Sequence, residues 1–148
     1  MEKAAINELN ALLKGEQMAI DAYERYIQDV DDENVKHELQ QIQQDHRKHA
    51  GELAARIQTL GGDPDYSTGF VGFMASAKAV MEGMNGHKTV DILKKAYDGE
   101  DKGIAKAEEV VKGDLDGESA ALVNKLLSDD HDHLKKMVNL IADFENRH

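Results

Sequence analysis

Apolar residues recur every three or four positions along four long stretches of this chain, which is the spacing of an amphipathic helix. Alanine, leucine, lysine, glutamate and glutamine are abundant, and all of them favour helices. The chain contains a single proline, Pro64, and no stretch alternates in the way that predicts a strand. Four helices are predicted, one over about residues 2–30 and three whose apolar residues lie within 35–60, 90–111 and 122–144.

The connections between these helices predict how they are arranged. The acidic turn at 31–33 and the turn at 113–117 are short, so each joins two antiparallel neighbours. Between the two hairpins lies the long segment 61–88, in which the apolar residues of 70–81 predict one short helix. A long crossover between two hairpins distinguishes a ferritin-like bundle from a simple up-down-up-down bundle. We therefore expect an all-α, ferritin-like four-helix bundle that forms a single domain, residues 1–148.

Composition narrows the range of functions. The chain has 148 residues, enough for one domain with a buried core, and it has no cysteine, which excludes disulfides, thiolate catalysis and iron–sulfur clusters. Its formal net charge of -11 repels phosphate backbones and anionic lipids, so neither nucleic acid nor a membrane is expected as a partner. The N-terminal residues lack the pattern of a secretory signal, which predicts a soluble, cytoplasmic protein.

The two predicted hairpins also resemble each other in sequence. An offset of 84 residues relates acidic and imidazole residues of one hairpin to identical residues of the other: Glu16 to Glu100, Asp45 to Asp129 and His49 to His133. Gly15 and Gly99, which precede the two glutamates in mid-helix, repeat as well, although glycine there costs about 1 kcal/mol relative to alanine. We interpret these glycines as allowing either close helix approach or movement of a carboxylate.

The repeated acidic and imidazole residues interrupt the apolar stripes, so they are expected to face the core. Counting from the two short turns, at about 1.5 Å per residue, places all six within about one helical turn of the same level. The four-residue spacing between each aspartate and its histidine puts both side chains on one helix face. The six residues therefore converge at one height inside the predicted bundle.

Buried carboxylates cost several kcal/mol each unless opposite charge is present, and no lysine or arginine lies in the stripes beside them. One or two metal ions would supply this charge. Carboxylate and imidazole ligands suit iron, manganese or zinc, and the ligand types do not choose among these metals. The predicted ligands are Glu16, Asp45, His49, Glu100, Asp129 and His133. His46 and Asp130 each lie three residues before a predicted histidine ligand, so they stay open as substitute ligands or as outer partners of a ligand. Tyr23 and Tyr97 stay open as groups that orient a ligand.

The segments 15–24, 49–64 and 99–101 are similar to ferritin-like proteins, and closest to a rubrerythrin-related group of small bacterial proteins known mainly as a domain of unknown function. The resemblance covers essentially the whole chain. Ferritins, bacterioferritins and rubrerythrins use a Glu from each of two helices and a Glu-x-x-His motif from each of the other two. The resemblance implies a di-iron carboxylate site in which Glu16, Glu100, His49 and His133 are ligands. His46 and Asp130 stand where those proteins have Glu, so two ligands stay open between neighbouring residues.

The resemblance further implies a metal-binding protein that reacts with oxygen, peroxide or ferrous iron in oxidative-stress defence, as a di-iron oxidase or peroxidase. Such a reaction would need an external electron donor, because the chain lacks the cysteine-bound iron of rubrerythrin. The absence of a fifth helix disfavours iron storage in a shell. The alternatives are a non-catalytic structural bundle and a metal-buffering bundle. A homodimer, through a flat helix face or through residues 70–81, also stays open.

Overall fold

The computed structural model describes residues 2–66 and 89–147, in which all regular structure is helical. Four helices make up the described part: α1 (Glu2–Asp29), α2 (Glu33–Thr59), α4 (Thr89–Val111) and α5 (Gly117–Arg147). The predicted all-α bundle is confirmed. The predicted short helix at 70–81 lies outside the described residues.

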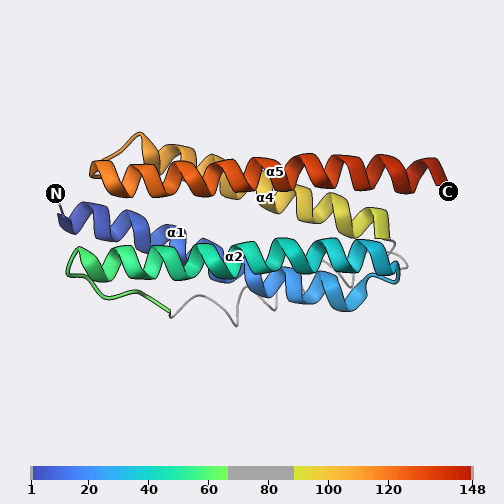
Figure 1. Ribbon diagram of the computed structural model, residues 1–148, viewed down its shortest axis with the longest axis horizontal. Helices are drawn as coiled ribbons and strands as arrows, with labels where there is room; N and C mark the ends of the chain where they lie inside the picture. Colours follow the sequence, from blue (N-terminus) through green and yellow to red (C-terminus); the bar gives the residue numbers. More distant parts are fainter. Residues whose placement is uncertain (1, 67–88, 148) are drawn as a thin grey trace.

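The four helices form two antiparallel hairpins, α1 with α2 and α4 with α5 (Figure 1). Between the hairpins, α1 lies beside α4 and α2 beside α5. The last residues of α2 and the first residues of α4 lie at opposite ends of the bundle in Figure 1. The connection between the hairpins therefore joins opposite ends, as the predicted long crossover requires. No helix in the described ranges combines the length and the apolar character needed to span a bilayer.

Two apolar clusters fill the interior and leave a polar layer between them. The cluster nearer the C-terminal end of α2 draws on all four helices and includes Leu9, Leu13, Leu53, Ile57, Ile104 and Val123. The cluster nearer the start of α2 includes Val35, Leu39, Ile42, Ile92, Leu93 and Met137. Burying a side chain of this kind contributes about 1.5–3 kcal/mol. The apolar stripes predicted from the sequence therefore meet in two clusters, one on each side of the polar layer.

The residues at the two ends of α2 show why this helix begins and ends where it does. Asp32 has extended backbone angles (φ -73, ψ 121), and its carboxylate accepts a hydrogen bond from the backbone N–H of Val35 at 2.9 Å. At the other end, Gly61 has φ 88, a conformation that favours glycine, and its N–H donates to the carbonyl of Gln58. An N-terminal aspartate cap and a C-terminal glycine thus fix the length of the helix.

We expect Asp32→Ala to lower the free energy of unfolding by about 1 kcal/mol, because the Val35 N–H loses its partner at the start of α2. Urea unfolding followed by circular dichroism measures the loss. Asp31→Ala is the matched control, since this exposed neighbour removes the same charge without removing the cap. Equal effects of the two substitutions would show that charge, rather than capping, is responsible.

Candidate metal centre

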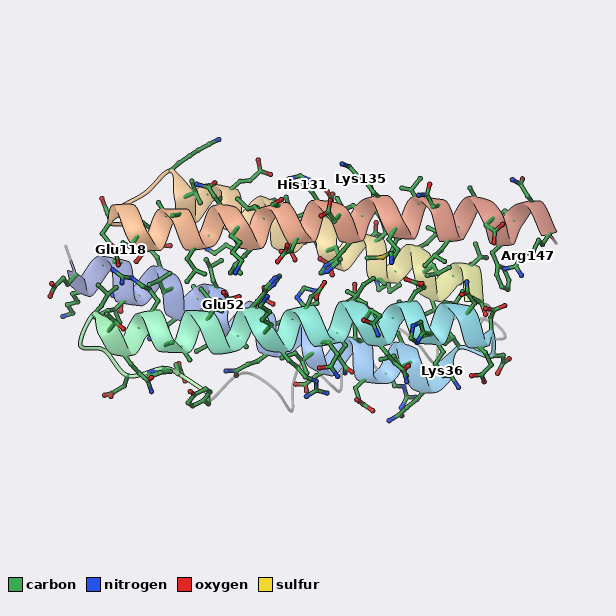
Figure 2. The ribbon with its side chains drawn as sticks, in the orientation of Figure 1. Lys36, Glu52, Glu118, His131, Lys135 and Arg147 are labelled. Carbon is green, nitrogen blue, oxygen red and sulfur yellow. The ribbon has the colours of Figure 1, made fainter. Side chains whose placement is uncertain are left out.

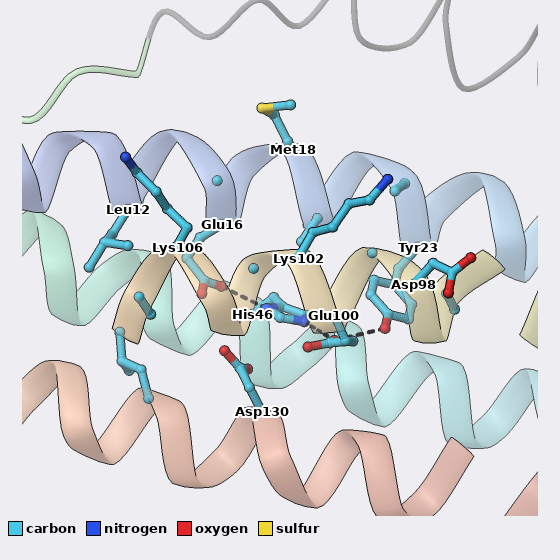
Figure 3. Close-up of a pocket in the computed structure, with 18 of the residues that line it drawn as sticks. Leu12, Glu16, Met18, Tyr23, His46, Asp98, Glu100, Lys102, Lys106 and Asp130 are labelled. Carbon is cyan, nitrogen blue, oxygen red and sulfur yellow. Dashed lines mark hydrogen bonds and ion pairs between the residues drawn. The ribbon is translucent and has the colours of Figure 1, made fainter. Parts of the chain in front are cut away.

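Six side chains from all four helices meet in the polar layer between the two apolar clusters. They form two overlapping groups, and within each group one nitrogen or oxygen atom of every member lies within 4.8 Å of the others. The groups are Glu16, His46, His49 and Asp130, and His46, Glu100, Asp130 and His133. Figure 3 shows the shared residues His46 and Asp130 between Glu16 and Glu100. All six are buried except Glu16, whose side chain is 11% exposed.

His49 and His133 are held by aspartates from the opposite hairpin. The Nε2 atom of His49, on α2, lies 2.9 Å from Oδ2 of Asp129 on α5. The Nε2 atom of His133, on α5, lies 2.8 Å from Oδ2 of Asp45 on α2. These two reciprocal hydrogen bonds fix the orientation of both imidazole rings, so that the Nδ1 atoms face the other residues of the layer.

His46 links the two glutamates. Its Nδ1 lies 2.7 Å from Oε2 of Glu16, and its Nε2 lies 2.5 Å from Oε1 of Glu100. The Tyr23 hydroxyl donates a hydrogen bond to the same Oε1 of Glu100 at 2.7 Å, and the tyrosine ring stacks on His46 with ring centroids 5.4 Å apart. A doubly protonated His46 therefore occupies the position between two carboxylates that a cation would also favour.

Three buried atoms of the layer have no hydrogen-bond partner: His49 Nδ1, His133 Nδ1 and Asp130 Oδ1. The Nδ1 atoms of His49 and His133 lie 3.8 and 3.5 Å from the Asp130 oxygen, and 3.6 and 3.3 Å from oxygens of Glu16 and Glu100 respectively. Unsatisfied buried polar atoms are rare and costly, at about 1–3 kcal/mol each. Two imidazole nitrogens and one carboxylate oxygen that face one another, with the outer nitrogens held by Asp129 and Asp45, are a donor set that fits metal ions.

Opposite charges within the layer outweigh the effect of burial on the pKa values of Glu100 and His133. Burial disfavours the Glu100 carboxylate, but His133 and His46 more than compensate and lower the pKa of Glu100 to about 2. Burial also disfavours protonated His133, but its interactions with Asp130, Glu100 and Asp45 raise the pKa of His133 to about 10. Protons on the imidazoles therefore supply the positive charge when no metal is bound.

The pKa values of the other four members also depend on burial and on the neighbouring charges, and for three of them the charges prevail. Burial opposes ionisation of Glu16, yet His46 and His49 lower its pKa. Burial opposes protonation of His46 and His49, yet the neighbouring carboxylates raise the pKa of both imidazoles. For Asp130 burial prevails, and the pKa of this carboxyl is raised. Asp130 is therefore the one carboxyl of the layer whose ionisation burial disfavours more than its neighbours favour it.

Two basic residues on the helices that supply the histidines, Arg56 on α2 and Lys136 on α5, are occupied elsewhere. Arg56 binds Asp116 and Glu118 at the end of the bundle, with N···O distances of 2.7 Å in both pairs. Lys136 binds Glu38 on the surface at 2.6 Å. The expectation that no lysine or arginine compensates the buried carboxylates therefore holds for the described residues.

The structure places some of the residues predicted from the sequence inside the polar layer and others outside it. It brings Glu16, His49, Glu100 and His133 together, as the repeat implies. Asp45 and Asp129, which the repeat favours as ligands, lie outside the layer, with side chains 51% and 38% exposed, against the outer nitrogens of the histidines. Their neighbours His46 and Asp130, considered above as substitutes, point inward. Tyr23 contacts the layer, whereas Tyr97 packs against the apolar cluster near the start of α2.

One buried polar residue was not singled out from the sequence. Gln43, 5% exposed, donates from Nε2 to the carbonyl of Ile20 at 3.0 Å and to Glu24 Oε1 at 3.2 Å. These bonds tie α2 to α1 about one turn from His46. The repeat gives no signal for this role, because the equivalent position in the second hairpin is Leu127.

Solved structures define the class of the protein. A dodecameric thioferritin, a bacterioferritin-related protein from Bacteroides fragilis, matches with a TM-score of 0.81 and 20% identity, covering 99% of this chain and 89% of that one. A ferritin-like, diiron-carboxylate protein from Bacillus anthracis matches with a TM-score of 0.69 and 25% identity, covering 95% and 96%. The bacterioferritin of Desulfovibrio desulfuricans, described with its diiron site, matches with a TM-score of 0.72 and 23% identity, covering 98% and 84%. The protein has the ferritin-like fold.

Within that class, residues 4–113 match the family described as a domain of unknown function, DUF2383, and the chain belongs to this family. The predicted resemblance to ferritin-like proteins and to such a domain is therefore confirmed. Its narrower relation to rubrerythrins stays a prediction. No curated protein matches the sequence.

The pKa shifts predict an unusual pH dependence for the metal-free protein. The pKa of His133 is raised from 6.5 to about 10, so its protonation contributes stability below pH 6.5 that is lost as the pH rises towards 10. The pKa of Glu100 is lowered from 4.5 to about 2, so its ionisation contributes stability above pH 4.5 that is lost as the pH falls towards 2. The free energy of unfolding, measured with urea in the presence of a chelator, should be greatest between pH 4.5 and 6.5 and should decline above pH 6.5.

His133→Ala should flatten the alkaline part of this curve. His131→Ala is the matched control, because His131 is exposed on the outer face of the same helix (Figure 2). A wild-type curve that stays level or rises from pH 6.5 to 10 would contradict the assignment of protonated imidazoles to the layer.

Proposed function

We propose that this chain is a two-metal carboxylate protein, with iron as the expected metal, and that it acts as an oxidoreductase on oxygen, peroxide or ferrous iron. One observation carries the proposal. His49 Nδ1, His133 Nδ1 and Asp130 Oδ1 are buried without hydrogen-bond partners and face one another between two glutamates. Metal ions would satisfy all three atoms and balance the carboxylates, which is a better account than a polar layer kept for stability alone.

The geometry supports a definite ligand set. Glu16 and His49 would hold one metal, Glu100 and His133 the other, and Asp130 lies within reach of both. His46 directs one ring nitrogen towards each glutamate. It lies between the two metal positions, where it stands beside Asp130 in place of a second carboxylate. In this proposal Asp45 and Asp129 are not ligands.

The residues around the layer have separate tasks in this proposal. Asp45 and Asp129 keep a proton on the outer nitrogens of His133 and His49, which leaves the Nδ1 lone pairs for the metals. The Tyr23 hydroxyl donates to Glu100 and fixes the orientation of that carboxylate. The apolar clusters on both sides limit access of water to the layer. Bound iron would supply electron exchange with an oxygen species, and an external donor would return the electrons.

The comparisons favour iron among the metals that these ligands accept. The Bacillus anthracis protein is described as diiron-carboxylate, and the bacterioferritin structure concerns its diiron site in different catalytic states. Three carboxylates and three imidazoles also suit manganese and zinc. Iron is proposed for this chain on the combination of fold and donor set.

A metal-buffering role is the second candidate, and one observation favours it. Because the raised pKa values of His46, His49 and His133 let protons balance the carboxylates, the metal-free layer is electrostatically compensated. A centre that remains folded without metal can load and release it reversibly. Consumption of oxygen or peroxide by the ferrous protein distinguishes the oxidoreductase from the buffer.

Elemental analysis of anaerobically purified protein tests the ligand set. We expect about two metal ions per chain in the wild type and a loss of at least one in Asp130→Asn, because this substitution weakens the oxygen that both positions share. Asp129→Asn should keep the stoichiometry and lower the affinity by about 10–100-fold, as for a residue that orients a ligand. The exposed Asp132→Asn on the same helix is the control. Full metal content in Asp130→Asn would refute this ligand set.

Metal binding should also release protons, because the imidazoles must be deprotonated to coordinate. Since the pKa values of His46, His49 and His133 are raised, affinity should increase at least about tenfold per pH unit between about pH 6 and 9. Calorimetric titration of ferrous iron under anaerobic conditions, in buffers of different ionisation enthalpy, counts the protons. Affinity that does not change with pH would mean that the metal does not bind at these histidines.

A further inference from the structure

A cavity of about 440 Å³ opens between α1 and α4 (Figure 3). Its volume lies within the range of about 300–1,000 Å³ that is usual for small-molecule sites. Most of its lining is apolar, and the polar side chains are confined to the floor and to one edge. A cavity of this size and character is suited to an organic ligand rather than to an ion.

The walls of the cavity include many small residues at helical spacing, beside larger ones such as Leu12 and Leu126. On α1 and α4 the small residues are Ala11, Gly15, Ala19, Ala22, Ala96, Gly99, Gly103 and Ala107. A Cβ atom added at Gly15, Gly99 or Gly103 would meet nothing within 4 Å. The glycines are therefore not needed for close helix packing, although each costs about 1 kcal/mol in helix propensity. Their effect is to keep the space between the two helices open.

The floor of the cavity is the proposed metal centre. Glu16, His46, Glu100 and Asp130 all line it. Asp130 is 6% exposed, and its unpartnered Oδ1 belongs to this floor. A molecule lying in the cavity would therefore contact the buried ligands directly.

The edge of the cavity formed by α4 is positively charged. Lys95, Lys102 and Lys106 line it at spacings of seven and four residues, which places them on one side of the helix. Figure 3 shows Lys102 and Lys106 at this edge, where Asp98 is the acidic neighbour. No residue of the described ranges forms an ion pair with these three lysines. In a chain of net charge -11, such an edge favours an anionic group locally.

We propose that the cavity binds an aliphatic carboxylate, with the carboxylate at the lysines of α4 and the hydrocarbon chain along the small residues above the metal centre. The apolar walls would bury the chain, and the lysines would compensate the charge of the head group. The proposal rests on the proposed function for the presence of metals beneath the chain, and it names the class of molecule that lies beside them.

Isothermal titration with decanoate tests this proposal on both the metal-loaded and the chelator-treated protein. Decanoate should bind, and decyltrimethylammonium, which has the same chain length and the opposite charge, should bind at least about tenfold more weakly. The double variant Lys102→Glu, Lys106→Glu should remove this preference, because the charge of the edge is reversed. Its metal content should equal that of the wild type, since neither lysine is a proposed ligand.

Filling the cavity is the second arm of the experiment. Gly103→Leu should weaken decanoate at least about tenfold while it increases helix propensity, so loss of binding would not reflect unfolding. Gly51→Leu is the matched control, because Gly51 also has nothing within 4 Å of an added Cβ but lies on α2, away from the cavity.

The outcomes separate this inference from the proposed function. Stoichiometric metal without decanoate binding would overturn the inference alone. Decanoate binding to a protein that takes up no metal would support the cavity and overturn the proposed function. Equal binding of the anionic and cationic amphiphiles, or equal effects of Gly103→Leu and Gly51→Leu, would also overturn the inference.

Discussion

Three carboxylates and three imidazoles share one buried layer at the middle of the bundle, and the rest of the structure depends on balancing their charges. Apolar clusters on both sides deny the layer the solvation that water would provide. Arg56 and Lys136, on the helices that supply the histidines, bind other acids instead. Compensation must come from protons on the histidines or from bound cations. Because protons and metals compete for the same nitrogens, folding, pH and metal content are coupled in this protein.

The architecture followed from the sequence because each of its determinants is local. Apolar spacing predicted four helices, and the short turns and the long connection predicted two hairpins with a crossover. The height of the site along the bundle could also be predicted from the sequence, since the rise per residue of a helix is fixed. The choice between Asp45 and His46, or Asp129 and Asp130, was harder. Neighbours in a helix point about 100° apart, and the direction of each depends on how the helix is rotated against its partners. The identity of the aspartates in both repeats indicated importance without indicating direction.

The mid-helix glycines show the same limit. Their recurrence at Gly15 and Gly99 was visible in the sequence, and two explanations were open. The structure excludes close helix packing at both positions, since an added Cβ would have free space around it. That conclusion depends on the distance between α1 and α4, which long-range packing determines and no local pattern encodes.

The crossed bonds, His49 to Asp129 and His133 to Asp45, have an evolutionary consequence. Each half of the molecule supplies the aspartate that positions the imidazole of the other half, so neither half completes the centre by itself. Two identical hairpins related by a two-fold axis would make the same pair of bonds. Joining the halves in one polypeptide removes the requirement that both be alike. Positions 46 and 130 are equivalent in the repeat, and they hold histidine in one half and aspartate in the other, so the two halves of the centre differ chemically at this pair.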